Sequence, residues 1–233
     1  MSQPQRTGLE SMSSEASHSN QSRPQELRQE YEDTTRAAHY RDNRWTRSPR
    51  ARRTHAKELA IVAAFLKGCE ADQGGDALKD LLDVPCGTGR FRSLLQDHAS
   101  TLVSIDASRE MLAAAPGAPQ LQASVHQLPL LGRSADFILC SRLLHHFQTS
   151  TERAMVLAEL ARVSRRWIVL SYFDSASVQA WRNRIRGSFR GRFPISRAQF
   201  ANEIAAAGLR ERERRYIQRG WSEQVWVRLE VTV

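Results

Sequence analysis

The stretch 80-DLLDVPCGTGRF-91 joins an apolar run and an acid to a turn that contains two glycines. The run LLDV (81–84) is typical of a buried strand, and GRFRSLLQDH (89–98) is typical of a following helix. Gly87 and Gly89 permit a positive φ and allow a ligand to approach the backbone closely. The turn alone is weak evidence for a ligand site, because many ordinary turns contain Gly-x-Gly.

Two acids lie at the ends of predicted strands. Asp83 can accept hydrogen bonds from a cationic ligand group or from amides of its own loop. Asp106 ends the strand TLVSID (101–106), where a carboxylate meets the ribose hydroxyls of an adenosine ligand. Asp106 could instead cap the helix SREMLAAA (108–115), for which Ser108 is equally suitable. The glycine turn and Asp106 together favour ligand binding over capping.

Strands and helices continue to alternate after this point. Further strands are predicted in LQASV (121–125), ADFILCS (135–141) and RWIVLSYF (166–173). Between the last two, TERAMVLAELARVS (151–164) has the period of an amphipathic helix. This alternation predicts an α/β fold whose mostly parallel sheet carries helices on both faces.

The C-terminal part has a different pattern. Ser196 to Ala207 predicts a helix that stops at Gly208. LRERERRYIQ (209–218) and EQVWVRLEVTV (223–233) then predict two long strands with no helix between them. We expect them to form an antiparallel hairpin that closes one edge of the sheet.

The N-terminal part is divided by composition. Residues 1–24 are rich in Ser, Gln, Asn and Glu without periodicity, so we expect a disordered tail. Residues 25–70 form a predicted helical segment, which includes an apolar helix from Leu59 to Leu66 ended by Gly68. Residues 71–233 form the main domain.

Composition limits the classes of partner. With 233 residues and 41% hydrophobic residues, the chain is long enough for one α/β domain with extra segments. The absence of a long apolar run predicts no membrane span, and we expect a cytoplasmic protein. The three cysteines contain no CxxC pair, so we expect neither a disulfide framework nor a metal site. The net charge of +9 favours anionic partners, but the sequence does not indicate an oligomeric state.

Residues from about 58 to 173 resemble the class I S-adenosylmethionine-dependent methyltransferases, most closely the small-molecule and quinone or lipid subgroup. The resemblance is carried, in order, by LLDVPCGTGRF, VSIDASREMLAAA, HQLPLLGRSADFILCSRLLHHF and LAELARVSRRWIVLSYF. It implies S-adenosylmethionine as cofactor and a Rossmann-like, seven-stranded sheet whose last strand is antiparallel. It also implies a loop after the first strand beneath the methionine part of the cofactor, and an acid after the second strand on its ribose.

Ten residues match the cofactor-binding positions of this family: Asp83, Pro85, Cys86, Gly87, Gly89, Asp106, Ala107, Ser124, Val125 and Ser141. Pro85 replaces the first glycine of the family motif; it fixes φ and removes an amide donor, which stiffens the loop if that amide is not needed. Ser124 stands where the family often has an aspartate for the adenine amino group. Adenine recognition would then depend on Ser124 and the neighbouring backbone. RVSRR (162–166) replaces the common Pro-Gly-Gly, which affects only the geometry of a turn.

The segment SRLLHHF (141–147) resembles the family's segment beside the transferred methyl group. His145 or His146 could act as a general base, because imidazole titrates near neutral pH. Alternatively, one histidine packs beneath the loop and the other contacts the next helix. His146 is the better candidate for a base. The chain lacks the Asn-Pro-Pro-Tyr type motif of DNA amino-methyltransferases, which counts against exocyclic base amines as acceptors.

Two further segments belong to the predicted site. For the first, residues 25–70, the resemblance implies a helical lid that closes over the cofactor; Tyr31, Tyr40, Arg44 and Trp45 could line it, or could anchor a helix on the core. The second is the insertion 175–196. Its aromatic and basic side chains are Trp181, Phe189, Phe193, Arg182, Arg184, Arg186, Arg190 and Arg192. These suit an anionic or lipid-anchored acceptor or RNA, or they form a solvated basic face.

The sequence therefore predicts an S-adenosylmethionine-dependent methyltransferase. The preferred reaction is O-methylation of a small or lipid-linked anionic acceptor. One alternative is an RNA methyltransferase that binds RNA through the basic clusters in 36–53 and 182–219. The other is a non-catalytic binding module that keeps the methyltransferase fold.

Overall fold

The computed structural model describes residues 45, 47–117, 119–187 and 192–232. The predicted tail 1–24 lies outside these residues, as do Tyr31, Tyr40, Arg44, Phe189 and Arg190.

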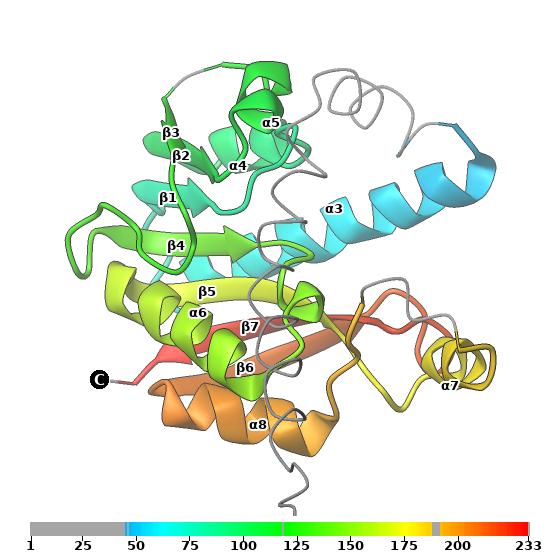
Figure 1. Ribbon diagram of the computed structural model, residues 1–233. Helices are drawn as coiled ribbons and strands as arrows, with labels where there is room; N and C mark the ends of the chain where they lie inside the picture. Colours follow the sequence, from blue (N-terminus) through cyan, green and yellow to red (C-terminus); the bar gives the residue numbers. More distant parts are fainter. Residues whose placement is uncertain (1–44, 46, 118, 188–191, 233) are drawn as a thin grey trace, which may run out of the picture.

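Within the described residues, strands form one seven-stranded sheet in the order β3-β2-β1-β4-β5-β7-β6 (Figure 1). The strands are β1 Asp80–Asp83, β2 Thr101–Asp106, β3 Gln120–Gln122, β4 Ala135–Cys140, β5 Ser164–Phe173, β6 Leu209–Tyr216 and β7 Gln224–Val231. The first five pair in parallel, whereas β7 runs antiparallel to both β5 and β6. The predicted Rossmann-like sheet with a C-terminal antiparallel hairpin is confirmed.

Helices cover both faces of the sheet. They are α3 Pro49–Ala71, α4 Arg92–Gln96, α5 Arg109–Ala114, α6 Ser150–Val163, α7 Val178–Ile185 and α8 Arg197–Ala206, with a 3₁₀ turn η1 at Leu144–His146. Helices α6 and α8 lie on one face and α3 and α4 on the other (Figure 1). Their buried side chains pack against the sheet. The fold therefore has three layers with a hydrophobic core on each side of the sheet.

Alternation along β4 shows why its sequence is continuously apolar. Phe137 and Leu139 belong to the core beneath α3, while Ile138 and Cys140 belong to the core beneath α6. Each of these side chains is fully buried. A strand covered on both faces needs apolar residues at every position, as in other parallel α/β sheets.

Helix α3 is longer than predicted, and the prediction that Gly68 ends it is wrong. The helix begins after Ser48, whose side chain accepts a 3.1 Å hydrogen bond from the amide of Ala51. It continues through Gly68 to Ala71. A Cβ atom at position 68 would lie 3.4 Å from the guanidinium of Arg228, which pairs with Asp72 at 2.6 Å. Glycine at this position gives room to Arg228 rather than ending the helix.

Other boundaries differ locally from the predictions. Strand β3 stops at Gln122, so Ser124 and Val125 lie in the following turn, where Ser124 bridges to Gln127. Helix α4 begins only at Arg92, because residues 85–91 form turns after β1. Helix α7 in the predicted insertion is an element that the sequence did not indicate.

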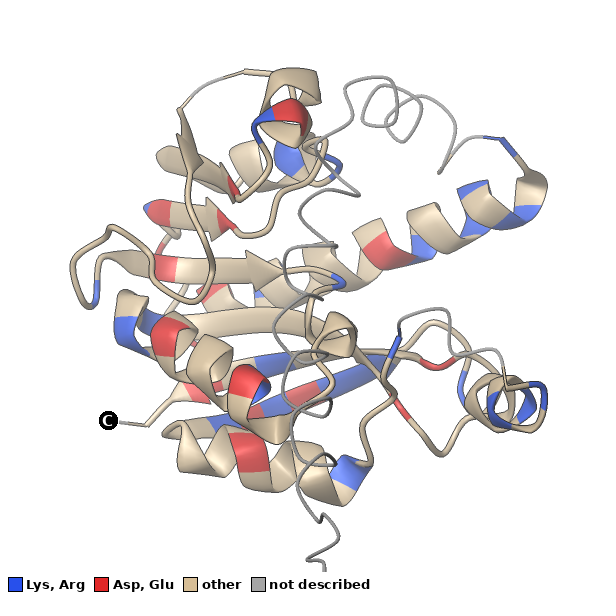
Figure 2. Ribbon diagram, viewed as in Figure 1, with Lys and Arg blue, Asp and Glu red and all other residues tan. Residues whose placement is uncertain are grey.

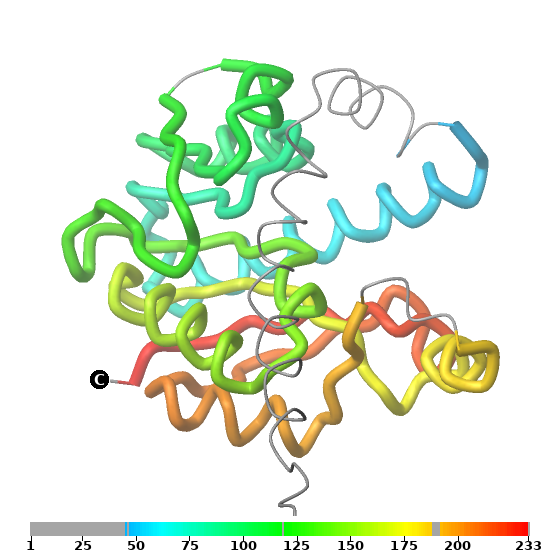
Figure 3. The backbone as a smooth tube through the Cα atoms, viewed as in Figure 1, coloured from blue at the N-terminus to red at the C-terminus, as the bar shows by residue number. Residues whose placement is uncertain are grey.

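The sheet order places a topological switch point between β1 and β4. The chain proceeds from β1 through β2 to β3 in one direction, and from β4 through β5 in the other. Loops that follow β1, β2 and β4 therefore meet at the carboxyl edge of the sheet, where ligands bind in open α/β folds. The N-terminal half of α3 and α7 both extend on this side (Figure 3). In the described part of the chain, no helix combines the length and apolar character needed to cross a bilayer.

Candidate functional site

The loop after β1 forms a tight turn built on two left-handed glycines. The amide of Gly89 donates to the carbonyl of Cys86 at 3.0 Å, and the amide of Cys86 donates to Ile105 of β2 at 2.8 Å. Gly87 has φ of 54° and Gly89 has φ of 73°. A Cβ atom on Gly89 would lie 2.9 Å from Pro116, so this position excludes any side chain, whereas no atom lies within 4 Å of a Cβ on Gly87. The loop is therefore packed beneath Gly89 and open above Gly87.

Asp106 connects this loop to the end of β2. Its Oδ2 accepts a 2.8 Å hydrogen bond from the amide of Gly87, and its Oδ1 accepts one of 2.9 Å from the amide of Ser108. Burial raises the pKa of Asp106, while these amide hydrogen bonds oppose the rise. Ser108 caps α5 by accepting a 3.1 Å hydrogen bond from Met111, so Asp106 is not needed as the cap.

Asp83 is a buried acid at the end of β1 whose side chain has no hydrogen-bond partner among the described residues. It is 1% exposed, and neither carboxylate oxygen is bonded within the described part of the chain. Burial raises its pKa to about 8, an effect that Arg90 reduces and Asp106 adds to. Among the described residues, no loop amide donates a hydrogen bond to Asp83, so this predicted alternative is not observed. Since an unsatisfied buried carboxylate is costly, a polar or cationic ligand group is the natural partner for it.

A buried ion pair lies between α3 and the residue after the glycine turn. Glu58 of α3 is fully buried and accepts hydrogen bonds from Arg90 and from the side-chain amide of Gln224. The guanidinium of Arg90 lies 3.9 Å from the ring centroid of Trp45 and contacts Ser141 at 3.4 Å. This cluster joins α3, the glycine loop, the carboxyl end of β4 and the amino end of the antiparallel strand β7.

Arg142 follows β4 and has a backbone conformation that is unusual for arginine. Its φ is 59°, and its amide donates to Ser171 at 2.9 Å. Its guanidinium donates to Gln224 at 2.9 Å and lies 3.6 Å from Glu58. A left-handed residue other than glycine is energetically costly and often marks a functional site. Arg142 is therefore a candidate for ligand contact that the sequence did not reveal.

The two histidines after β4 differ in their surroundings. His145 is 1% exposed and stacks on Phe173 with ring centroids 3.8 Å apart and an interplanar angle of 1°. Its carbonyl accepts a 2.7 Å hydrogen bond from the amide of Phe193. His146 is only partly buried, with its ring 4.4 Å from that of His145. His145 thus packs beneath the loop, and His146 keeps its place as the candidate base.

The remaining predicted cofactor residues lie around the same edge. Ala107 accepts a 3.1 Å hydrogen bond from Gln122, and Val125 is buried in the core beneath α6. The hydroxyl of Ser124 accepts a 3.3 Å hydrogen bond from the amide of His126 within its turn. Cys86 is buried, and burial raises the pKa of its thiol. Pro85 follows Val84 through a cis peptide bond.

Comparison with known proteins identifies the type of domain. A family model described as a methyltransferase domain matches residues 82–167, which include the glycine loop, Asp106 and both histidines. Residues 82–167 therefore form a methyltransferase domain of the class I S-adenosylmethionine-dependent type. S-adenosylmethionine is the cofactor of this family, and the chain is a methyltransferase that uses it. No curated protein matches the sequence.

Solved methyltransferases share the fold at low sequence identity. The chain is similar to magnesium protoporphyrin IX methyltransferase (ChlM) from Synechocystis PCC 6803 with bound SAH: the TM-score is 0.71 and the identity 15%, over 89% of this chain and 99% of that chain. It is also similar to the N-methyltransferase NodS from Bradyrhizobium japonicum WM9 in complex with S-adenosyl-L-homocysteine. There the TM-score is 0.62 and the identity 17%, over 87% of this chain and 98% of the other.

The described residues fit this cofactor. The carboxylate of Asp83, to which no described residue donates a hydrogen bond, suits the ammonium group of the cofactor's methionine part, and the open side of Gly87 leaves room above the loop. Each oxygen of Asp106 keeps a further lone pair for a ribose hydroxyl beside its amide hydrogen bond.

Sequence reasoning missed Glu58, Arg90 and Arg142. A signal for Glu58 was available: it occupies the buried stripe of α3 that continues through Ile61, Val62, Phe65, Leu66 and Cys69. An acid on such a stripe needs a buried cationic partner. No comparable signal marked Arg142, because arginine gives no indication of a left-handed backbone.

Proposed function

We propose that this methyltransferase transfers a methyl group to an oxygen of a small or lipid-linked anionic acceptor. In this proposal the ten predicted residues contact the cofactor, and His146 is the base where the acceptor is a hydroxyl. The proposed setting is the cytoplasm. The placement of Arg142 is the observation that carries the proposal.

Arg142 lies within the segment SRLLHHF (141–147), which resembles the family's segment beside the transferred methyl group. Its guanidinium carbon lies 5.3 Å from the ring centroid of Trp45 and 5.7 Å from that of Phe173. Arg192 approaches the same Phe173 ring at 5.8 Å. A planar guanidinium beside aromatic rings suits a carboxylate or phosphate attached to an apolar body. This supports an anionic acceptor at the carboxyl edge of the sheet.

The neighbours support a small acceptor. The similar Synechocystis protein is named for magnesium protoporphyrin IX, which is a small molecule. Because that similarity rests on 15% identity, we take from it the size class of the acceptor and not its identity.

Each residue at the carboxyl edge of the sheet would have a separate role in the reaction. S-adenosylmethionine supplies a methyl group that is activated by its sulfonium. Gly87 would lie beneath the methionine part, Asp106 would bind the ribose, and Asp83 would pair with the ammonium group. The acceptor oxygen must lie in line with the methyl group, and Arg142 would hold the acceptor's anionic group to fix that line. The imidazole of His146 would receive the proton of a hydroxyl acceptor, whereas a carboxylate acceptor needs no base.

The segment 25–70 is proposed to close over the cofactor as a lid. Support comes from Trp45, whose ring stacks on Arg90, and from Glu58, which pairs with the same guanidinium. The C-terminal half of α3 belongs to the core, so any lid movement would be limited to its N-terminal half and the residues before it.

The test is transfer of labelled methyl from the cofactor to a cell extract, with and without the protein. We expect label in small molecules or lipids, and we expect alkali to release methanol if the product is an ester. Arg142→Met should abolish the transfer, while Arg133→Met, at another arginine with positive φ (52°), should not. Label in RNA would replace the proposal with RNA methylation, and binding of S-adenosylhomocysteine without any transfer would contradict catalysis.

A further inference from the structure

Helix α7 presents its large apolar residues to solvent, whereas Ala180 and two polar side chains face the protein. Gln179 and Asn183 face inward, where their side-chain amides lie 3.5 and 3.3 Å from the carboxylate of Glu223. On the outer side, Val178 is 39%, Trp181 61% and Ile185 65% exposed. A surface helix of a globular domain normally has the reverse arrangement. The outer face of α7 is therefore suited to contact something other than the rest of this chain.

The loop between β6 and β7 extends this apolar face. The first two amides of α7, those of Val178 and Gln179, donate to the carbonyls of Gly220 and Trp221 at 2.9 and 3.2 Å. These bonds fix the loop against the start of the helix. Trp221 is 59% exposed. Four of the six large apolar side chains that are exposed in the described residues thus belong to α7 and this loop.

Arginines flank the apolar face on both sides. At a helical spacing of about 100° per residue, Val178, Trp181 and Ile185 project within a sector of about 60°. Arg182 falls on one side of that sector and Arg184 on the other. Both are exposed, as are Arg186 and Arg219, and no acid occurs between Ser175 and Gly187. Exposed tryptophan and aliphatic side chains bordered by arginines are typical of a helix that lies in a membrane interface.

We propose that the outer face of α7 and the loop 217–222 dock this protein on an anionic lipid bilayer. Val178, Trp181, Ile185 and Trp221 enter the interface, and Arg182, Arg184, Arg186 and Arg219 contact anionic headgroups. The aliphatic residues favour a bilayer over RNA. RNA bases would stack on the tryptophan rings, but they would gain little from contact with exposed valine and isoleucine.

The docked orientation is consistent with the position of the functional site. Helix α7 and the N-terminal turns of α3 project on the same side of the molecule, and both carry arginine or lysine (Figure 2). This is the side of the carboxyl edge, so docking brings the site close to the lipid surface. The inference does not depend on the proposed acceptor, but it would explain how a lipid-linked acceptor reaches Arg142.

The test uses the full-length protein and vesicles of two compositions. One is phosphatidylcholine alone, and the other is an equal mixture of phosphatidylcholine and phosphatidylglycerol. We expect co-sedimentation with the mixed vesicles, much weaker binding to the neutral ones, and weakening by salt. Absence of binding to mixed vesicles would overturn the proposal and leave the proposed methylation untouched.

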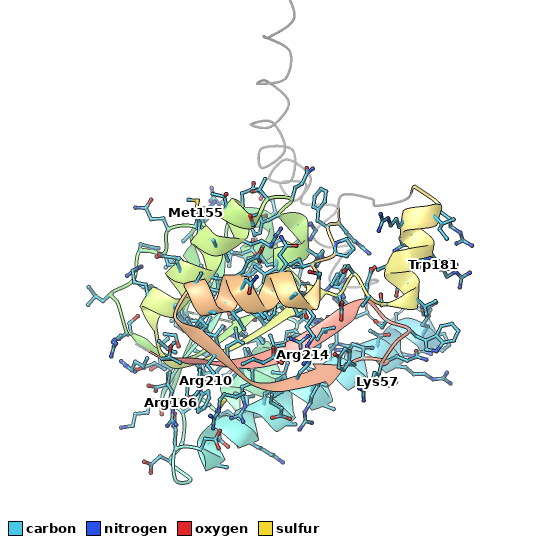
Figure 4. All side chains as sticks on the ribbon, turned by 90° about the horizontal axis from the view of Figure 1, so that it is seen from below. Lys57, Met155, Arg166, Trp181, Arg210 and Arg214 are labelled. Carbon is cyan, nitrogen blue, oxygen red and sulfur yellow. The ribbon has the colours of Figure 1, made fainter. Side chains whose placement is uncertain are left out.

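Matched variants test whether the outer face of α7 is the surface that binds the vesicles. Trp181→Ser with Ile185→Ser should lower the partition coefficient at least about tenfold, and Arg182→Gln with Arg186→Gln should lower it about fivefold per arginine. Control pairs are Leu131→Ser with Met155→Ser, and Arg197→Gln with Arg212→Gln. These are exposed residues on other elements, and Met155 on α6 lies well away from Trp181 on α7 (Figure 4). Equal loss in test and control pairs would overturn the proposal, as would RNA binding that depends on the arginines but not on the apolar pair.

Discussion

The backbone amide of Gly87 donates a 2.8 Å hydrogen bond to Oδ2 of Asp106, which ties the glycine loop after β1 to the end of β2. The second oxygen of Asp106 binds the amide of Ser108 at 2.9 Å, at the start of α5. One carboxylate thus fixes the loop beneath the proposed methionine site and the helix beside the proposed ribose site. Loss of Asp106 should therefore disturb both halves of the cofactor site at once.

Asp106→Ala should abolish measurable binding of S-adenosylhomocysteine in calorimetry, because it removes both acceptor oxygens. Asp106→Asn keeps one acceptor and should weaken binding about tenfold or more, since a hydrogen bond to a charged group contributes about 1.5–3 kcal/mol. Asp97→Asn changes an exposed acid at the end of α4 and should leave the affinity unchanged. Unchanged affinity in Asp106→Ala would place the ribose elsewhere.

Gly87→Val should destroy cofactor binding, because valine disfavours a φ of 54° and its side chain would fill the open side of the loop. Gly75→Val is the matched control. Gly75 also has positive φ, 93°, and no atom within 4 Å of a Cβ, but it lies in the turn after α3. Both variants should lose similar unfolding free energy, and only Gly87→Val should lose affinity. Pro85→Gly should keep the affinity within a few-fold; a much larger loss would show that proline is needed there.

The fold was predictable because its main signals are local. Strands covered on both faces, such as β4, give continuous apolar runs, and Ser108 and Ser196 are recognisable caps. The error at Gly68 came from a long-range contact, since the glycine makes room for Arg228 from β7. Helix α7 was missed although Val178, Trp181 and Ile185 have helical spacing, because the helix has only eight residues and is interrupted by arginines.

Only those residues of the candidate site that lie within the family motif could be predicted from the sequence. Gly87, Gly89 and Asp106 lie within consecutive β-α units, so their proximity follows from a parallel sheet. Glu58 reaches the site from α3, and its partner Arg90 lies 32 positions later in the sequence. Such pairing depends on the three-dimensional packing of α3, which no local pattern encodes.

The pair formed by Glu58 and Arg90 should be important for stability. Glu58→Gln leaves a buried guanidinium without its carboxylate, which we expect to cost about 3–5 kcal/mol of unfolding free energy. Glu70→Gln on the same helix breaks the more exposed contact with His98, 2.8 Å long, and should cost less than about 1 kcal/mol. Urea denaturation of both variants gives the comparison. Equal small losses would mean that Arg90 finds another partner or that water solvates it.

Asp83 should make the stability of the cofactor-free protein fall as pH rises. Its pKa is about 8 in the folded chain and about 3.9 when unfolded. Between these values the folded state binds more protons than the unfolded state, so Asp83 lowers the unfolding free energy by up to about 1.4 kcal/mol per pH unit. Asp83→Asn should remove this slope from urea denaturation measured between about pH 5 and about pH 7.5, whereas Asp97→Asn should not.

Binding of the cofactor should also change the protonation of the Asp83 carboxyl. At neutral pH most of the Asp83 carboxyl is protonated, and pairing with the ammonium group of S-adenosylhomocysteine favours the carboxylate. Binding should therefore release close to one proton. Calorimetry in two buffers with different ionisation enthalpies measures this release directly. Asp83→Asn should bind without releasing a proton, and a wild-type protein that releases none would show that Asp83 does not contact the ammonium group.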